Sequence, residues 1–184
     1  AMEDVTGEMR RSAKAVNFGL VYGISEFGLA RNIGIPRREA HDFIARYFER
    51  YPGIRKYMDD SVRRGYAEEC TVTMMGRRRP LPELKASSAN TRSFGERVAM
   101  NAPVQGSAAD IIKLAMVRVH SALQEGHYRA RLILQVHDEL LIECPAEETK
   151  EVERLLKDCM EKAVSLSVPL IAEVKSGSSW YETK

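Results

Sequence analysis

Three adjacent polar residues stand between two apolar runs in the second half of the chain: His137, Asp138 and Glu139. Apolar runs of this kind predict two strands, with the polar triplet exposed at the turn between them. Adjacent carboxylates can hold a divalent cation, because hard ions such as Mg²⁺ prefer oxygen ligands. The same residues also suit a turn that is simply hydrated. The pattern therefore leaves a metal site and an ordinary acidic turn both open.

A second chemically useful group recurs every four positions near the start of the sequence: Arg10, Lys14, Phe18 and Tyr22. In a helix each step of four rotates the position by only about 40°, so these side chains share one stripe. Two cations followed by two aromatic rings offer phosphate contacts and a stacking surface, which is what a nucleotide needs. An amphipathic helix that buries its two rings in a core would show the same spacing.

A third row, Arg97, Asn101 and Gln105, has the same spacing of four. Such side chains can reach the minor-groove acceptors N3 and O2, which all Watson–Crick pairs offer in similar positions. Contacts of this kind ignore sequence but respond to the geometry of the pair. Helix capping and buried hydrogen bonds are the alternative roles for this row.

Local patterns predict the elements that position these groups. A helix is expected over residues 8–23, with Thr6 as its N-cap. Periodicity predicts further helices over 24–32, 36–51, 53–65, 90–101, 104–123 and 146–164. Strands are expected within 70–79 and over 129–136, 140–144 and 169–175. Pro103 is expected to end one helix and start the next, because proline lacks the N–H that a helix interior needs.

Composition excludes several classes of protein. The chain is 44% hydrophobic and 29% charged, which is ordinary for a globular protein. Its apolar runs are shorter than the roughly 18 residues that a membrane span requires, and no signal-peptide pattern opens it. Its three cysteines show no CxxC spacing, which argues against zinc and fits reduced thiols. A cytoplasmic location without a membrane partner is expected.

Charge is distributed unevenly along the sequence. Residues 1–97 carry 18 Lys and Arg against 13 Asp and Glu, whereas residues 98–184 carry 10 against 13. Arginine dominates the basic half, and its planar fork suits phosphate recognition. The first half therefore fits either a nucleic-acid partner or a solvated basic surface.

The run RRSAKAVNFGLVYG, from Arg10 to Gly23, resembles the fingers-helix motif of the family A DNA polymerases. The resemblance continues to the C-terminus. It implies that Arg10 and Lys14 hold the triphosphate of the incoming nucleotide. It also implies that Phe18 packs on the nucleotide sugar and that Tyr22 lies beside the nascent base pair.

The resemblance implies DNA-binding roles as well. The run NAPVQG, which begins at Asn101, is similar to the family pattern, and the family residues matching Arg97, Asn101 and Gln105 contact the minor groove of the primer–template. His137 matches a residue near the primer terminus, where positioning is its implied role.

The catalytic assignments follow from the same resemblance. Asp138 matches the second catalytic aspartate, a metal ligand, and Glu139 matches an accessory carboxylate near the metals. The family's reaction is attack of a primer 3′-hydroxyl on the α-phosphate of a deoxynucleoside triphosphate, assisted by two Mg²⁺ ions. Lys14 would act as a catalytic residue by neutralising charge on the leaving triphosphate.

The implied fold is α+β. A mainly helical fingers subdomain is expected over about residues 1–89, and the C-terminal part of the palm over residues 90–184. In the palm, a small antiparallel sheet, whose hairpin carries Asp138, would pack on helices. The implied protein is a DNA-directed DNA polymerase of the bacterial cytoplasm that copies a DNA template.

The family's first catalytic aspartate motif is not found ahead of the helix predicted at residues 8–23. The isolated chain is therefore expected to be inactive or nearly so, with the N-terminal part of the polymerase as a candidate partner. Two alternatives remain: a non-catalytic nucleic-acid-binding module, and a metal-dependent hydrolase built on residues 137–139. DNA binding that ignores Asp138 and added nucleotide would favour the first. Hydrolysis lost in Asp138→Ala would favour the second.

Overall fold

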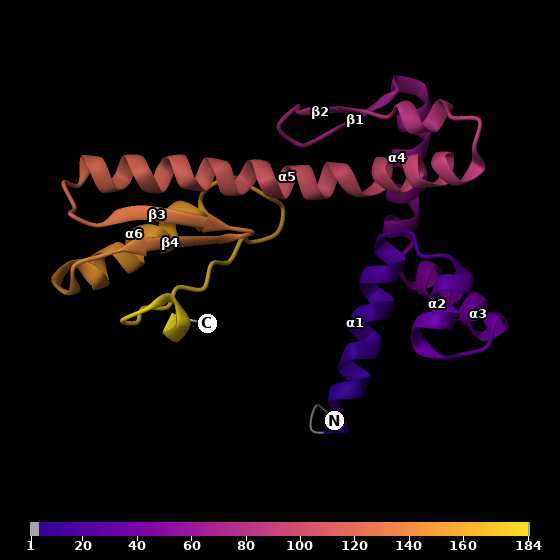
Figure 1. Cartoon of the computed structure of the whole chain (residues 1–184), viewed down its shortest axis with the longest axis horizontal. Coiled ribbons are helices and arrows are strands. Elements are labelled where there is room, and N and C mark those ends of the chain that lie inside the picture. Colours follow the sequence, from indigo (N-terminus) through magenta and orange to yellow (C-terminus); the bar gives the residue numbers. More distant parts are fainter. Residues whose placement is uncertain (1–3, 184) are drawn as a thin grey trace. The chain divides into compact units, whose positions relative to one another are not determined.

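The computed structural model describes residues 4–183 of the chain (Figure 1). The chain divides into two compact units, Ala1–Gln105 and Gly106–Lys184. Across the described residues, none of the helices is both long and apolar enough to cross a bilayer. Helices combine with two small antiparallel sheets, so the α+β class predicted from the sequence is confirmed.

Four helices open the first unit: α1 (Gly7–Val21), α2 (Glu26–Ile33), α3 (Arg37–Arg50) and α4 (Pro52–Glu68). The predicted N-cap of α1 is confirmed, because the Thr6 hydroxyl accepts a hydrogen bond from the Met9 N–H at 3.2 Å. Apolar side chains of α1, α2 and α3 form a core, whose buried members are Val16, Leu20, Leu29 and Ala40. This core fixes which side of α1 faces inward.

A hairpin and the start of a long helix complete the first unit. The elements are β1 (Cys70–Val72), β2 (Arg78–Pro80), a 3₁₀ helix (Pro82–Lys85) and α5 (Ala89–Glu125). β1 and β2, in the segment where strands are expected from the sequence, pair antiparallel. Leu81 and Leu84 are buried against Val98 and Ala99 of α5. This second core holds the first part of α5 in place.

The predicted helix break at Pro103 is wrong, because α5 continues through this residue. A proline inside a helix leaves the carbonyl four residues earlier without its usual donor, and that carbonyl belongs to Ala99. The Thr71 hydroxyl lies 3.5 Å from the Ala99 oxygen, and the Tyr57 hydroxyl donates to the neighbouring Met100 oxygen at 2.9 Å. Hydroxyl groups from β1 and α4 thus lie beside two successive carbonyls of α5, just before the proline.

The second unit contains the rest of α5 together with β3 (Arg131–Val136), β4 (Glu139–Glu143) and α6 (Thr149–Glu161). β3 and β4 form an antiparallel hairpin, seen as neighbouring arrows in Figure 1. The pairing of Val136 with Glu139 leaves His137 and Asp138 as the turn. The core between hairpin and helices is apolar, and its buried members are Ala115, Val119, Leu123, Ala130, Leu140, Val152 and Ala163.

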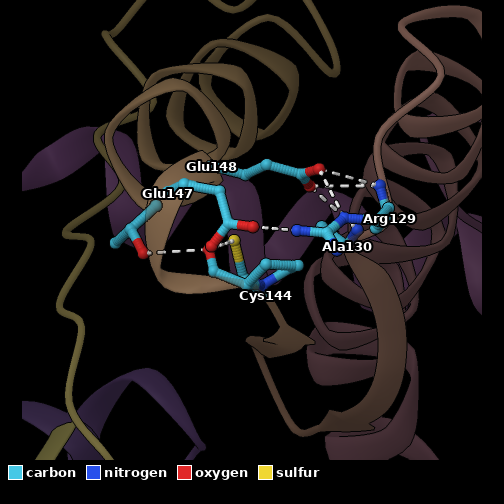
Figure 2. A network of polar contacts seen from close by, with 7 residues as sticks. Arg129, Ala130, Cys144, Glu147 and Glu148 are labelled. Carbon is cyan, nitrogen blue, oxygen red and sulfur yellow. Dashed lines mark hydrogen bonds and ion pairs between the residues drawn. The ribbon is translucent and has the colours of Figure 1, made fainter.

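The hairpin is anchored at its open end by a network of polar contacts (Figure 2). The Glu148 carboxylate, which follows β4, accepts hydrogen bonds from the backbone N–H groups of Arg129 and Ala130 at 3.1 Å, just before β3. The Arg129 guanidinium also pairs with the Glu147 carboxylate. These contacts fix where the hairpin begins, and therefore where its turn lies.

The strand predicted over residues 169–175 is wrong, because within the described residues this segment belongs to neither sheet. Burial does alternate here, with Ala172 buried between exposed neighbours. However, the Ala172 N–H donates to the Glu161 carboxylate of α6 at 3.1 Å rather than to a strand. An alternating pattern alone cannot reveal whether a ladder partner is present.

Candidate functional site

The row on α1 points away from the core of the first unit. Arg10, Lys14, Phe18 and Tyr22 are all exposed, with Phe18 52% and Tyr22 43% accessible. The two rings are stacked with centroids 6.1 Å apart, and the Lys14 ammonium lies 5.8 Å from the centre of the Phe18 ring. The structure thus disfavours the alternative in which both rings are core residues. It leaves a cationic and aromatic stripe available to a ligand.

The C-terminal end of α1 packs against α5. Gly23 has a φ of +78°, and a Cβ at this position would lie 2.8 Å from the Met100 Cε and 3.5 Å from the Arg97 Cγ. Only glycine adopts this backbone without strain and leaves room for the neighbouring helix. The Asn101 amide lies 3.5 Å from the Tyr22 carbonyl oxygen. The aromatic end of the α1 row is therefore brought beside two members of the third row.

The third row keeps its spacing because α5 is continuous. Arg97 and Gln105 are exposed and Asn101 is half-buried. The Arg97 guanidinium donates to the Ser93 hydroxyl one turn earlier, at 3.1 Å, which restricts its rotamers. Arginine, asparagine and glutamine side chains can all donate hydrogen bonds to base edges. One continuous helix therefore carries all three side chains.

The polar triplet of the second unit occupies the tip of the β3–β4 hairpin. His137, Asp138 and Glu139 are all exposed. His137 has a φ of +54°, and the Gln135 side-chain amide donates to its carbonyl oxygen. A non-glycine residue in the left-handed region costs about 1–2 kcal/mol. Such strain is concentrated at functional sites, where a fixed side-chain direction matters more than stability.

The carboxylates at this tip suit the protein's share of a Mg²⁺ site. Mg²⁺ is usually held by one or two carboxylates, with waters and substrate phosphates as its other ligands. Asp138 in the turn and Glu139 at the start of β4 supply two such groups. Within residues 4–183, no group of three or more His, Cys, Asp or Glu could hold a metal ion. Further ligands would therefore come from the substrate, from water or from residues outside this set.

A cavity of about 850 Å³ in the second unit was not predicted from the sequence. Its lining is mainly apolar and comes from α5, the β3–β4 hairpin, α6 and residues 170–180, together with Asp138 and Glu139. These segments are far apart in the chain, so no local motif could indicate the cavity. Asp138 and Glu139 thus border this cavity while remaining exposed.

The model of DNA polymerase family A matches residues 1–182, and the chain belongs to this family. The resemblance noted from the sequence is confirmed.

Relatives in this family are DNA polymerase I proteins. The chain is 54% identical over 181 residues to that of Caldicellulosiruptor bescii, covering 98% of this chain and 21% of the relative. It is 53% identical over 184 residues to that of Bacillus subtilis, covering 100% of this chain and again 21% of the relative. The chain thus spans about a fifth of the length of these curated relatives.

A solved structure has the same fold. The POL domain of Pol1 from M. smegmatis, in complex with DNA primer-template and dNTP, superposes with a TM-score of 0.88 and 46% sequence identity. The match covers 92% of this chain and 30% of that one. It supports the arrangement of elements described above.

Proposed function

We propose that this chain forms the nucleotide-binding surface and part of the metal site of a bacterial DNA polymerase that carries out template-directed DNA synthesis. The observation that carries the proposal is the outward row on α1, whose aromatic end packs against α5. In this proposal the fingers subdomain extends to about residue 89, and residues 90–184 belong to the palm. The enzyme acts in the cytoplasm, where its nucleotide substrates are found.

The α1 row would bind the incoming nucleotide along its length. Arg10 and Lys14 are the cations for the triphosphate, because both are exposed and lie one turn apart. Phe18 would pack on the sugar. Tyr22 would lie beside the new base pair, since its ring stacks on Phe18 at the end of the helix that contacts α5.

The DNA primer–template would be held by polar side chains. Arg97, Asn101 and Gln105 would contact the minor groove near the growing end. His137 would position the primer terminus, because its left-handed backbone fixes the direction of its side chain. None of these contacts depends on base sequence, as copying of any template requires.

In the proposed reaction, the primer 3′-oxygen forms a bond to the α-phosphorus while the bond from that phosphorus to the pyrophosphate oxygen breaks. Asp138 would hold Mg²⁺, with Glu139 as an accessory carboxylate. Bound Mg²⁺ supplies charge stabilisation for the attacking and leaving oxygens. Lys14 would add positive charge beside the leaving pyrophosphate, where negative charge develops.

The proposal is tested in a chimera in which these 184 residues replace the matching part of the Bacillus subtilis DNA polymerase I. Primer extension with Mg²⁺ and deoxynucleotides is the assay. Lys14→Ala should lower kcat/KM by about 10²–10³, the usual effect of losing one transition-state contact. Asp138→Asn should lower it at least as much. Lys150→Ala and Glu125→Gln, which change exposed charges away from the cavity beside Asp138, are the matched controls.

Two results would overturn the proposal. The first is a chimera that folds but does not extend primers. The second is an active chimera in which Lys14→Ala and Asp138→Asn behave like the controls. Salt-dependent DNA binding without synthesis would then favour a non-catalytic binding module. The 184-residue chain by itself is expected to show little or no extension, since other polymerase segments would complete the metal site.

A further inference from the structure

α5 continues through Pro103 although proline usually breaks a helix, and the proposed polymerase reaction does not explain this continuity. Proline has no N–H, and its ring crowds the carbonyl four residues earlier. In α5 that carbonyl belongs to Ala99, which is 0% exposed. Water cannot reach a fully buried carbonyl, so its hydrogen bond has to come from the protein.

Two hydroxyl groups lie at this point of the helix. The Thr71 side chain, from β1 and only 9% exposed, lies 3.5 Å from the Ala99 oxygen, a long hydrogen bond. The Tyr57 hydroxyl, from α4, donates to the Met100 oxygen at 2.9 Å. Two successive carbonyls of α5 therefore have side-chain donors at the proline.

These carbonyls lie inside the row that would read base pairs. Arg97 precedes Ala99 by two residues, Asn101 directly follows Met100, and Gln105 lies beyond the proline. A break or a shift of the helix here would rotate Gln105 away from the other two side chains. The direction of the whole row therefore depends on how the helix is held at residues 99–103.

We propose that Thr71 and Tyr57 are positioning residues that replace the helical hydrogen bonding disturbed by Pro103 and so keep Arg97, Asn101 and Gln105 in one row on the minor groove. This inference rests on the proposed function, in which that row contacts the primer–template. Neither hydroxyl touches the substrate. Each acts through the backbone of α5.

The backbone part is tested by double-mutant cycles in the 184-residue chain. Thr71→Val should lower the folding equilibrium constant about tenfold, because it leaves a buried carbonyl without a donor. In a Pro103→Ala background, residue 103 regains an N–H for the Ala99 oxygen, so the same change should have less than a twofold effect. Thr91→Val, at an exposed position, and Tyr51→Phe, whose ring is 50% exposed, are the matched controls.

The positioning part is tested in the polymerase chimera. The ratio of extension rates from matched and mismatched primer ends reports on minor-groove contacts rather than on stability. Thr71→Val and Tyr57→Phe should each reduce this ratio several-fold below the melting temperature, and Pro103→Ala should restore it in the Thr71→Val chimera. The two control substitutions should leave the ratio unchanged.

The outcomes separate the inference from the function on which it rests. An inactive unsubstituted chimera refutes the proposed function and the positioning role with it. An active chimera whose ratio does not change in either hydroxyl variant refutes the positioning role alone. Absence of coupling between Thr71→Val and Pro103→Ala refutes the backbone replacement. Coupling in folding together with a reduced and rescued ratio supports the inference.

Discussion

The anchor at the open end of the β3–β4 hairpin allows a quantitative prediction about the turn that carries Asp138. The side chain of Glu148 is 18% exposed, and its carboxylate accepts from two backbone N–H groups, those of Arg129 and Ala130. Ala130 is itself only 2% exposed. Replacing Glu148 by alanine would leave the Ala130 N–H buried without this acceptor, whereas the N–H of the exposed Arg129 can be hydrated.

The expected loss of folding stability follows from the burial of one N–H group and the hydration of the other. A buried donor without a partner costs about 1–3 kcal/mol, and a hydrogen bond to a charged group contributes about 1.5–3 kcal/mol. Because one of the two donors is hydrated in the variant, Glu148→Ala should destabilise the fold by about 2–3 kcal/mol. Glu148→Gln keeps an acceptor oxygen but loses the charge, so a loss of about 1 kcal/mol is expected.

Glu147 provides the matched control, because it also pairs with Arg129 but its side chain is 66% exposed. Water screens exposed ion pairs, so Glu147→Ala should cost much less stability than Glu148→Ala. Urea denaturation with an unchanged m-value measures all three variants. Equal losses in Glu148→Ala and Glu147→Ala would refute the assignment of the anchor to buried N–H groups. Amide hydrogen exchange in β3 should follow the same ranking as the loss of stability. Exchange should be fastest in Glu148→Ala, slower in Glu148→Gln and slowest in Glu147→Ala.

Three further predictions concern backbone strain and pH. His137→Gly should raise stability by about 1 kcal/mol in urea denaturation, because glycine adopts the positive φ freely, while primer extension by the chimera falls. Gly23→Ala should lower the melting temperature, with a loss of about 1–3 kcal/mol, because a Cβ would strain the backbone and meet the Met100 Cε. Hydrogen bonding with Glu26 raises the pKa of His41 from 6.5, and the same contact lowers the pKa of Glu26 from 4.5. The contact between His41 and Glu26 therefore stabilises the fold only while both groups are charged. This stabilisation is lost as pH rises through the raised pKa of His41 or falls through the lowered pKa of Glu26. The melting-temperature difference from His41→Gln should therefore be largest between pH 4.5 and 6.5, and a difference that stays constant up to pH 9 would contradict this.

Features fixed by local chemistry could be read from the sequence. The cap at Thr6 needs only a hydroxyl and the next helical turn, and the shared stripe from Arg10 to Tyr22 follows from helical geometry. Spacing could not tell which way that stripe faces. Packing of Val16 and Leu20 in the core decides it, because these residues lie on another side of α1.

Features that depend on distant partners could not be read in the same way. Pro103 indicates a helix break wherever no other donor is present, and the hydroxyls of Thr71 and Tyr57 lie 28 and 43 residues from the carbonyls they reach. At residues 169–175 a strand is predicted, but within the described residues this segment has no ladder partner. Both errors arise because hydrogen-bond partners far along the chain are invisible to a local pattern.

The length of α5, 37 residues, also affects how quickly different parts of this helix open to solvent. One stretch of this helix supplies Val98 to a core of the first unit, and a later stretch supplies Val119 to the core of the second. Between them stand Pro103 and Gly106, the two residue types that least favour a helix. Opening of the backbone in one stretch therefore need not spread to the other, so a single uninterrupted helix can contain two segments that exchange their amide protons at different rates.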